Sequence, residues 1–281
     1  MDNYDFKEIQ SYEDFEIIAD LLKKVFKTSK FSEEYLRWLY LNNPNGNVVG
    51  FNAFFNDQLV AHYALVPIEG KLHEKKLNCL LSLNTATAEN HQKKNLFKIL
   101  ANKSFDLAKS KNYDIVVAVA NANSIHGFIN NLGFTHIGKL DAQISFFFPS
   151  LRNIKRKDIL TFPLSKEIMK WRLNNPLGKY HRIVISNSRF IFHDFHKLFR
   201  VIIHAEKSKK FSKKFNLKMP KLNIFIGISQ KYHWGIKKYF KFNLPNFMRP
   251  SPLHLVVKDL KNGKSINKNN INFECINFDA Y

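Results

Sequence analysis

The feature that most constrains the fold is the stretch from Leu80 to Phe134, where strand, turn and helix signals follow one another without a gap. Residues 80–87 have strand character, and residues 89–95 form a polar turn. From residue 96 on, apolar side chains recur at the spacing of an amphipathic helix, and residues 115–120 read as a buried strand. We therefore expect the chemistry of the protein to lie in this stretch.

The turn before the predicted helix carries an unusual charge pattern. Lys93 and Lys94 stand where the helix dipole presents its positive end, so the two charges alone would weaken the helix. A bound polyanion would reverse this effect, because free amides, dipole and ammonium groups would all attract it. Asn95 tolerates the left-handed conformation that such a turn requires. The alternative is an ordinary exposed lysine pair.

These residues resemble the acetyl-CoA-binding core of the GCN5-related N-acetyltransferases (GNAT). In that family a strand runs into a turn Gln/Arg-x-x-Gly-x-Gly/Ala, and a helix follows. A second strand leads to an Asn and to a short helix that ends in Gly-Phe. The corresponding residues here are Gln92–Phe97, Asn121 or Asn123, and Gly133-Phe134. Both glycines of the turn are replaced, and Ile129 stands where the family often has a Tyr that protonates the leaving thiolate.

The resemblance implies acetyl-CoA as co-substrate and no metal. Its pantetheine would pair with the backbone near the end of the first strand, and its diphosphate would lie on the amides of the turn. The cofactor-binding residues expected on this basis are Thr85, Thr87, Gln92, Lys93, Lys94, Asn95, Leu96, Phe97, Asn121 and Asn123.

Three residues are candidates for the proton transfers. His126 lies one helical turn before Ile129 and is a candidate for the role of the missing Tyr, although it also fits a purely structural place. Glu89 is near in sequence but also reads as a surface carboxylate. Asn84 is suited to orient a water, or is simply a polar residue of a half-exposed strand.

The rest of the first half predicts the element order of the same fold. We expect a strand at residues 4–9, a helix capped by Ser11, a helix at 32–41, and a hairpin at 48–55 and 58–67 around Asn56-Asp57. Residues 134–137 and 142–148 are expected to close the sheet. The predicted class is a mixed α/β sheet, with a GNAT catalytic domain at residues 1–150.

Charge separates the two halves of the 281-residue chain. Residues 1–150 hold 16 basic and 16 acidic residues, so residues 151–281 carry the entire net charge of +21. The run Trp38–Gly46 is echoed by Trp171–Gly178, one residue shorter, and strand-like runs follow in both places. This predicts a duplication in which residues 151–281 form a basic, shortened GNAT-like domain. The layout resembles that of two-part acetyltransferases of surface-polysaccharide pathways.

Other classes are less well supported by the sequence. The basic run at residues 207–215 fits a solvated surface, an anionic membrane surface, a charged substrate or a phosphate backbone, but no nucleic-acid-binding module accompanies it. The eleven His are scattered without metal-ligand spacing. Two distant cysteines, an acidic N-terminus and the lack of an 18-residue apolar run predict a cytoplasmic protein without a membrane span.

We expect an N-acetyltransferase that acts on the amine of a small acceptor. The resemblance to polysaccharide enzymes suggests an amino sugar or a nucleotide-linked amino sugar, whose diphosphate the basic half would offset. The alternatives are an acetyltransferase for an aminoglycoside or a protein lysine, and a non-catalytic acyl-CoA-binding or scaffold protein. The oligomeric state is left open by the sequence.

Overall fold

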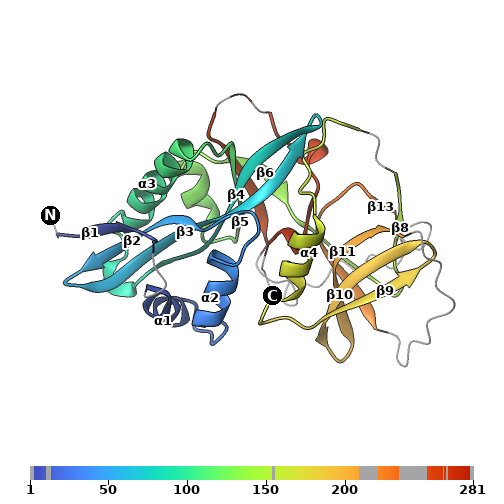
Figure 1. Ribbon diagram of the computed structural model, residues 1–281, viewed down its shortest axis with the longest axis horizontal. Coiled ribbons are helices and arrows are strands. Elements are labelled where there is room, and N and C mark those ends of the chain that lie inside the picture. Colours follow the sequence, from blue (N-terminus) through green and yellow to red (C-terminus); the bar gives the residue numbers. More distant parts are fainter. Residues whose placement is uncertain are drawn as a thin grey trace.

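The computed structural model describes residues 3–10, 14–153, 156–208, 221–233, 252–261, 263 and 265–278. Two large β-sheets lie side by side, and α4 lies between them in the view of Figure 1. In the described residues, β8 and β13 pair in a separate two-stranded sheet. The elements up to residue 151 are β1 (Asp5–Glu8), α1 (Asp14–Phe26), α2 (Glu33–Tyr40), β2 (Val49–Phe55), β3 (Gln58–Leu72), β4 (Lys75–Thr87), η1 (Glu89–His91), α3 (Leu96–Ser110), β5 (Ile115–Ala120), η2 (Gly127–Asn131), β6 (Thr135–Lys139), β7 (Asp141–Ser145) and β8 (Ser150–Leu151). The later elements are α4 (Lys166–Leu173), β9 (Tyr180–Ile185), β10 (Ser188–His196), β11 (Phe199–Lys207), β12 (Leu222–Ile228), β13 (Tyr232–His233), β14 (His254–Asp259), η5 (Lys268–Asn270), β15 (Phe273–Glu274) and η6 (Cys275–Asn277).

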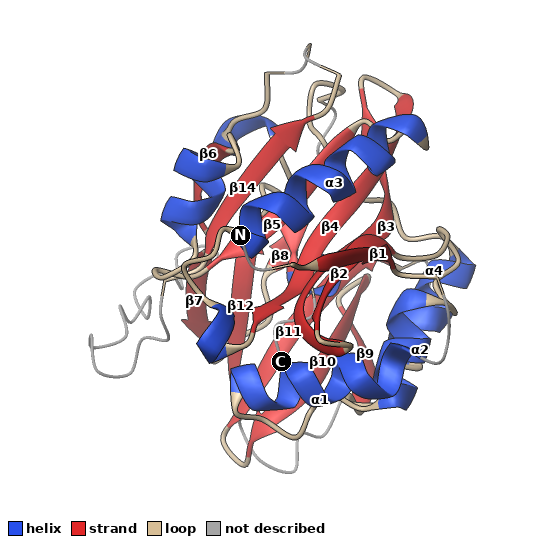
Figure 2. Ribbon diagram, turned by 90° about the vertical axis from the view of Figure 1, so that its left-hand side faces the viewer, coloured by secondary structure: helices blue, strands red, loops and turns tan. Residues whose placement is uncertain are grey.

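The first sheet has the strand order β1-β2-β3-β4-β5-β14-β6. Strands β4 and β5 pair in parallel, and the other neighbours pair antiparallel. Helix α3 covers one face of the sheet, as Figure 2 shows, and α1 and α2 pack against the other. This is the α/β fold with a mixed sheet that the sequence predicts.

Local signals explain several boundaries of the first half. The Ser32 hydroxyl accepts a hydrogen bond from the amide of Tyr35 and so caps α2. Asn56 and Asp57 have φ angles of 49° and 60°, as a two-residue type I′ hairpin requires. The predicted helix and hairpin are therefore confirmed, whereas the predicted cap at Ser11 lies outside the described residues.

Two strands are exchanged between the sheets. The prediction that residues 142–148 close the first sheet is wrong, because β7 pairs with β12 of the second sheet. Strand β14, from the far end of the chain, inserts between β5 and β6 instead. The domain boundary at residue 150 stays a prediction, and the exchanged strands cross it in both directions. Strand pairings between residues this distant in sequence depend on tertiary packing, which local sequence patterns do not reveal.

Part of the second sheet repeats the strand order β2-β3-β4-β5 of the first. Strands β9, β10 and β11 pair antiparallel, and β11 pairs in parallel with β12, as β2, β3, β4 and β5 do. Helix α4 precedes β9 as α2 precedes β2, and Ser165 caps α4 as Ser32 caps α2. After each helix, the side chain of Asn43 or Asn175 accepts a hydrogen bond from the amide two residues on. The echo in the sequence thus marks equivalent structural positions.

The two helices of the echo meet through their tryptophans. The rings of Trp38 and Trp171 stack at 4.8 Å with an interplanar angle of 20°. Trp38 Nε1 donates to the Trp171 carbonyl at 2.9 Å, and Trp171 Nε1 donates to the Trp38 carbonyl at 2.8 Å. Equivalent residues thus make reciprocal contacts, which is the pattern expected of a local two-fold relation between the halves.

The described part of the chain also bears on the surface predictions. None of its helices is long and apolar enough to cross a membrane. It contains no group of three or more His, Cys, Asp and Glu side chains suited to a metal ion. Of the basic run at residues 207–215, Lys207 and Ser208 are described, and the rest of the run lies outside the described residues.

Candidate active site

Strands β4 and β5 separate at a bulge in β4. Their parallel pairing runs from Cys79 opposite Ile115 to Ser82 opposite Ala118 and then ends. Beyond it, Asn84 and Thr85 lie within a register shift between β3 and β4, and Asn84 has a φ of 54°. A bulge bends its strand and interrupts the ladder. The bulge therefore accompanies an opening between the two strands.

A cleft of about 410 Å³ lies at this opening. Its described lining residues are Phe26, Thr28, Lys30, Phe31, Leu81, Ser82, Leu83, Asn84, Thr85, Val119, Asn121, Ser124, Phe128, Leu253 and Phe278. They include one lysine but no carboxylate. Thr85 Oγ1 is buried without a hydrogen-bond partner. Because a buried polar atom normally has a partner, this hydroxyl is suited to a ligand in the cleft.

A buried chain of side chains holds Asn84 in place. Asn84 Nδ2 donates to the Tyr40 hydroxyl at 3.1 Å, and that hydroxyl lies 2.9 Å from His62 Nε2. His62 Nδ1 lies 2.7 Å from Asn52 Oδ1. With His62 Nδ1–H donating to Asn52, Nε2 accepts from Tyr40, so each of the three contacts joins a donor to an acceptor. Asn52 Nδ2 is buried without a hydrogen-bond partner. The bulged backbone and this chain together fix the position of Asn84.

Burial keeps this chain neutral. It lowers the pKa of His62 from 6.5 to about 3, so the imidazole is uncharged at neutral pH. Burial also raises the pKa of Tyr40, against a smaller lowering by the hydrogen bond from Asn84. Neither group therefore exchanges a proton readily near pH 7, and the chain positions Asn84 instead.

Replacement of Tyr40 by Phe tests this positioning role. The change leaves His62 Nε2 and Asn84 Nδ2 without their shared partner, so we expect the free energy of unfolding to fall by about 1–3 kcal/mol. Chemical denaturation measures this, with Tyr113→Phe as the control because the Tyr113 side chain is half-buried and outside the chain of contacts. Equal stability of the two variants would contradict the role assigned to Tyr40.

The predicted turn lies at the start of α3. Lys93 and Asn95 have φ angles of 62° and 59°, so the left-handed conformation predicted for Asn95 is confirmed and Lys93 shares it. Asn95 is the N-cap of α3, and its side chain makes no capping hydrogen bond. The first amides of an α-helix have no partner within the helix. The N-terminus of α3 thus offers the amide donors that an anion needs.

The other predicted cofactor residues surround this turn. Gln92 is exposed and its Nε2 lies 3.5 Å from the carbonyl oxygen of Thr87, at the end of β4. Lys94 is exposed, with Nζ 5.9 Å from the centre of the Tyr4 ring. Leu96 is buried in the core, and Phe97 packs against the ring of Phe128 at 5.8 Å. The last two residues thus anchor the helix start.

The polar residues after β5 have unequal positions. Asn121 lines the cleft, and its Oδ1 accepts hydrogen bonds from the amides of Asn123 and Ser124, both at 3.0 Å. Asn123 is exposed and is not among the described lining residues. The short helix η2 that follows ends at Asn131, and Gly133 just beyond it has a φ of 67°, which suits glycine in the predicted Gly-Phe pair.

The three candidates for proton transfer are separated by the structure. Asn84 lines the cleft, whereas Glu89 and His126 are exposed and are not among its described lining residues. The hydrogen-bonded chain of the Tyr40, His62 and Asn52 side chains was not recognised from the sequence. The period-2 pattern of β3 could have placed His62 on the core face, but nothing local pairs it with Tyr40.

The equivalent opening in the second sheet is filled by the chain itself. The parallel pairing of β11 with β12 ends at Phe225, and Gly227 further along β12 pairs with both Asp141 and Glu274. A strand residue has one neighbour on each edge, so β15 lies on the edge that β11 has left. A Cβ on Gly227, which has a φ of 155°, would lie 2.5 Å from the carbonyl oxygen of Phe273. The close approach therefore requires glycine.

Comparisons with known proteins agree with this arrangement. Residues 6–137 match the family described as acetyltransferase (GNAT) domain. The first half therefore contains a GNAT domain. A comparison with curated proteins gives no match.

Solved structures share the fold over nearly the whole chain. A probable N-acyltransferase from Enterococcus faecalis V583 aligns with a TM-score of 0.63 at 9% identity, over 92% of this chain and 73% of that one. A GCN5-related N-acetyltransferase from Anabaena variabilis aligns with a TM-score of 0.61 at 9% identity, with the same coverage. The N-myristoyltransferase of Saccharomyces cerevisiae, solved with bound myristoyl-CoA, aligns with a TM-score of 0.58 at 10% identity, over 92% and 83%.

The GNAT match and the fold together support an acyltransferase with an acyl-CoA co-substrate.

Proposed function

We propose that the protein transfers an acetyl group from acetyl-CoA, bound across the opening between β4 and β5, to the amine of a small acceptor. The observation that carries the proposal is the cleft itself, which opens at the Asn84–Thr85 bulge of the domain that carries the turn before α3. Thr85 Oγ1 would bind the pantetheine arm, and the amides from Lys93 to Phe97 would hold the diphosphate. When bound, acetyl-CoA supplies the activated thioester carbonyl.

The residues of the cleft mainly align the two substrates. The acceptor nitrogen attacks the thioester carbonyl, the carbon–sulfur bond breaks, and the nitrogen loses one proton. Alignment supplies much of the rate acceleration in such a transfer. In this proposal Asn84, held by Tyr40, would orient a water that receives the proton. The Ser124 hydroxyl, which lines the same cleft, would protonate the leaving thiolate in place of the absent Tyr.

We further propose that the acceptor is an amino sugar, free or linked to a nucleotide. The sugar class follows from the resemblance in layout to enzymes of surface-polysaccharide pathways. The described lining of the cleft includes Lys30 and no carboxylate. A cation there suits the diphosphate of a nucleotide sugar better than a polycationic aminoglycoside.

Release of free thiol measures the transfer directly. We expect purified protein with acetyl-CoA to release thiol in the presence of a nucleotide-linked amino sugar, and little with aminoglycosides or lysine peptides. A protein that binds acetyl-CoA but transfers it to no amine would instead be a non-catalytic acyl-CoA-binding protein. The isoleucine at position 129 favours that second function, because the usual proton donor is missing.

Charge reversal at the turn tests the placement of acetyl-CoA. The double change of Lys93→Glu and Lys94→Glu should weaken acetyl-CoA binding by about 2 kcal/mol or more, which is over tenfold, because two attractive charges near the diphosphate become repulsive. Isothermal titration calorimetry measures this and should find one acetyl-CoA per chain, since the second opening is filled.

Two controls separate the turn from general charge effects. Lys103→Glu alters an exposed charge in the middle of α3 and should leave acetyl-CoA affinity nearly unchanged. Acetyl-pantetheine lacks the diphosphate, so its affinity should not depend on Lys93 and Lys94. Equal losses for both ligands would place the diphosphate elsewhere.

A further inference from the structure

We propose that Phe278 sets the length of the acyl group that the cleft accepts, an inference that rests on the proposed binding of acyl-CoA between β4 and β5. Phe278 is 4% exposed and lines the cleft, although it lies almost 200 residues from β4 in sequence. It belongs to the last described segment of the chain, which also fills the opening in the second sheet.

The surroundings of Phe278 form an apolar part of the cleft. Leu83 of β4, Val119 of β5 and Leu253 beside β14 line the cleft with it and pack against one hydrophobic cluster, to which Phe278 belongs. Helix α3 packs against a different cluster, on the opposite face of the sheet. A chain extending from the thioester, away from the diphosphate site at α3, would therefore enter this apolar region and meet the Phe278 ring.

The Phe278 ring is held in position by neighbouring residues of the same segment. It stacks on the ring of Phe273 with 5.3 Å between centroids and an interplanar angle of 14°. The Phe278 amide donates to the Cys275 carbonyl at 3.1 Å, and the Glu274 amide donates to Asn277 Oδ1 at 2.8 Å. These bonds close η6 into a tight turn that fixes where Phe278 begins.

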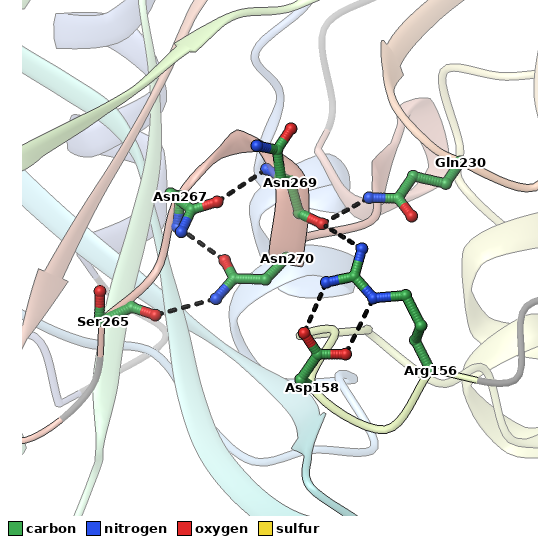
Figure 3. Close-up of polar contacts among 7 residues, drawn as sticks. All are labelled: Arg156, Asp158, Gln230, Ser265, Asn267, Asn269 and Asn270. Carbon is green, nitrogen blue, oxygen red and sulfur yellow. Dashed lines mark hydrogen bonds and ion pairs between the residues drawn. The ribbon is translucent and has the colours of Figure 1, made fainter.

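The segment is anchored to the second sheet by the buried carboxylate of Glu274. Its oxygens lie 2.5 Å from Lys231 Nζ and 2.9 Å from His204 Nδ1, and they accept a hydrogen bond from the Tyr232 hydroxyl at 3.1 Å. The preceding turn is tied to two other segments, as Figure 3 shows, because Arg156, which lies between β8 and α4, and Gln230, which follows β12, both donate to the Asn269 carbonyl. Phe278 is thus a fixed wall of the first-half cleft, positioned by contacts with the second half.

The apolar setting gives the expected size of the effect. Burial of one methylene group is worth about fourfold in affinity. Butyryl-CoA carries two more methylenes than acetyl-CoA, and hexanoyl-CoA carries four. Where the Phe278 ring blocks the longer acyl chains, their extra methylene groups add no affinity. Removal of the ring makes room for these acyl chains.

Calorimetric titration of acetyl-, butyryl- and hexanoyl-CoA tests the inference without knowledge of the acceptor. For Phe278→Ala we expect the affinity for butyryl- and hexanoyl-CoA, relative to acetyl-CoA, to rise by about tenfold or more over that of the unaltered protein. Phe278→Leu, which disturbs the core less, should give a smaller rise of the same sign.

The matched control is Phe162→Leu. Phe162 also packs on Phe273, with 5.5 Å between ring centroids, but it is not among the described residues of the cleft. It should leave the chain-length ratio unchanged. Unchanged ratios in both Phe278 variants, with acetyl-CoA still bound, would overturn the role of Phe278 alone. Absence of any acyl-CoA binding by the unaltered protein would overturn the proposed function and this inference with it.

Discussion

Replacement of Glu274 by Ala is expected to lower the free energy of unfolding by about 3–5 kcal/mol. The Glu274 side chain is buried and contacts Lys231, His204 and Tyr232. Its removal leaves the Lys231 ammonium, whose side chain is only 20% exposed, without its counter-charge. It also weakens the attachment of β15, which then depends on its backbone pairing with β12. Urea denaturation followed by circular dichroism measures the loss.

A second glutamate in the same sheet provides the control. Glu206 lies on β11 and pairs with Arg189 at 2.6 Å, but both side chains are about 40% exposed. Exposed pairs contribute about 0–1 kcal/mol, so Glu206→Ala should have little effect. If the two variants lost equal stability, the Glu274 cluster would not be the anchor of the C-terminal segment.

The Glu274 effect should also depend on pH. Burial alone would raise the pKa of Glu274, but the charge of Lys231 and the hydrogen bond from His204 outweigh it and lower the pKa from 4.5 to about 2. Because the folded-state pKa is depressed, the stabilisation is complete above the unfolded value and is lost as the pH falls towards 2. The difference in stability between the unaltered protein and the Glu274→Ala variant should therefore shrink between pH 5 and pH 2.

The second large effect is expected at the tryptophan pair that joins the halves. Trp171→Ala should cost about 3–5 kcal/mol, because it empties a buried site and leaves the Trp38 carbonyl without its donor. Trp38→Ala should cost a similar amount, since the contacts are reciprocal. Thermal and urea denaturation of both variants measure these losses.

Phenylalanine at either position serves as the matched control. It keeps an aromatic ring in the stack but removes one indole donor, so Trp171→Phe should cost about 1–3 kcal/mol.

In the double variant with alanine at both positions, the losses should be less than additive by about 0.5–3 kcal/mol, because each single change already breaks the shared contact. Strict additivity would show that Trp38 and Trp171 stabilise their own halves independently.

How much of the site was predictable differs from residue to residue. Asn95 was expected in a left-handed turn before a helix, and the structure has it there, because the preference belongs to the residue and its neighbours. His126 was a candidate from its spacing to Ile129, yet it lies exposed outside the described cleft lining. Helical spacing predicts a shared face, but it does not show whether that face lines the cleft.

The duplication, too, was predictable in part. Trp38 and Trp171 were matched from a short echo, and α2 and α4 do occupy equivalent places with the same serine caps. That the two rings stack on each other could not be inferred, because nothing in either segment specifies its partner. The exchange of β7 and β14 between the sheets was missed for the same reason.

The sequence by itself determined the helices, hairpins and turn of the first half and the equivalence of the second, since periodicity, caps and turn residues act over a few positions. Only the tertiary structure decided which strand closes each sheet, how Tyr40 and His62 hold Asn84, and that Phe278 reaches the cleft of the other half. These contacts join residues 20 to 200 positions apart, and packing of the whole core selects them.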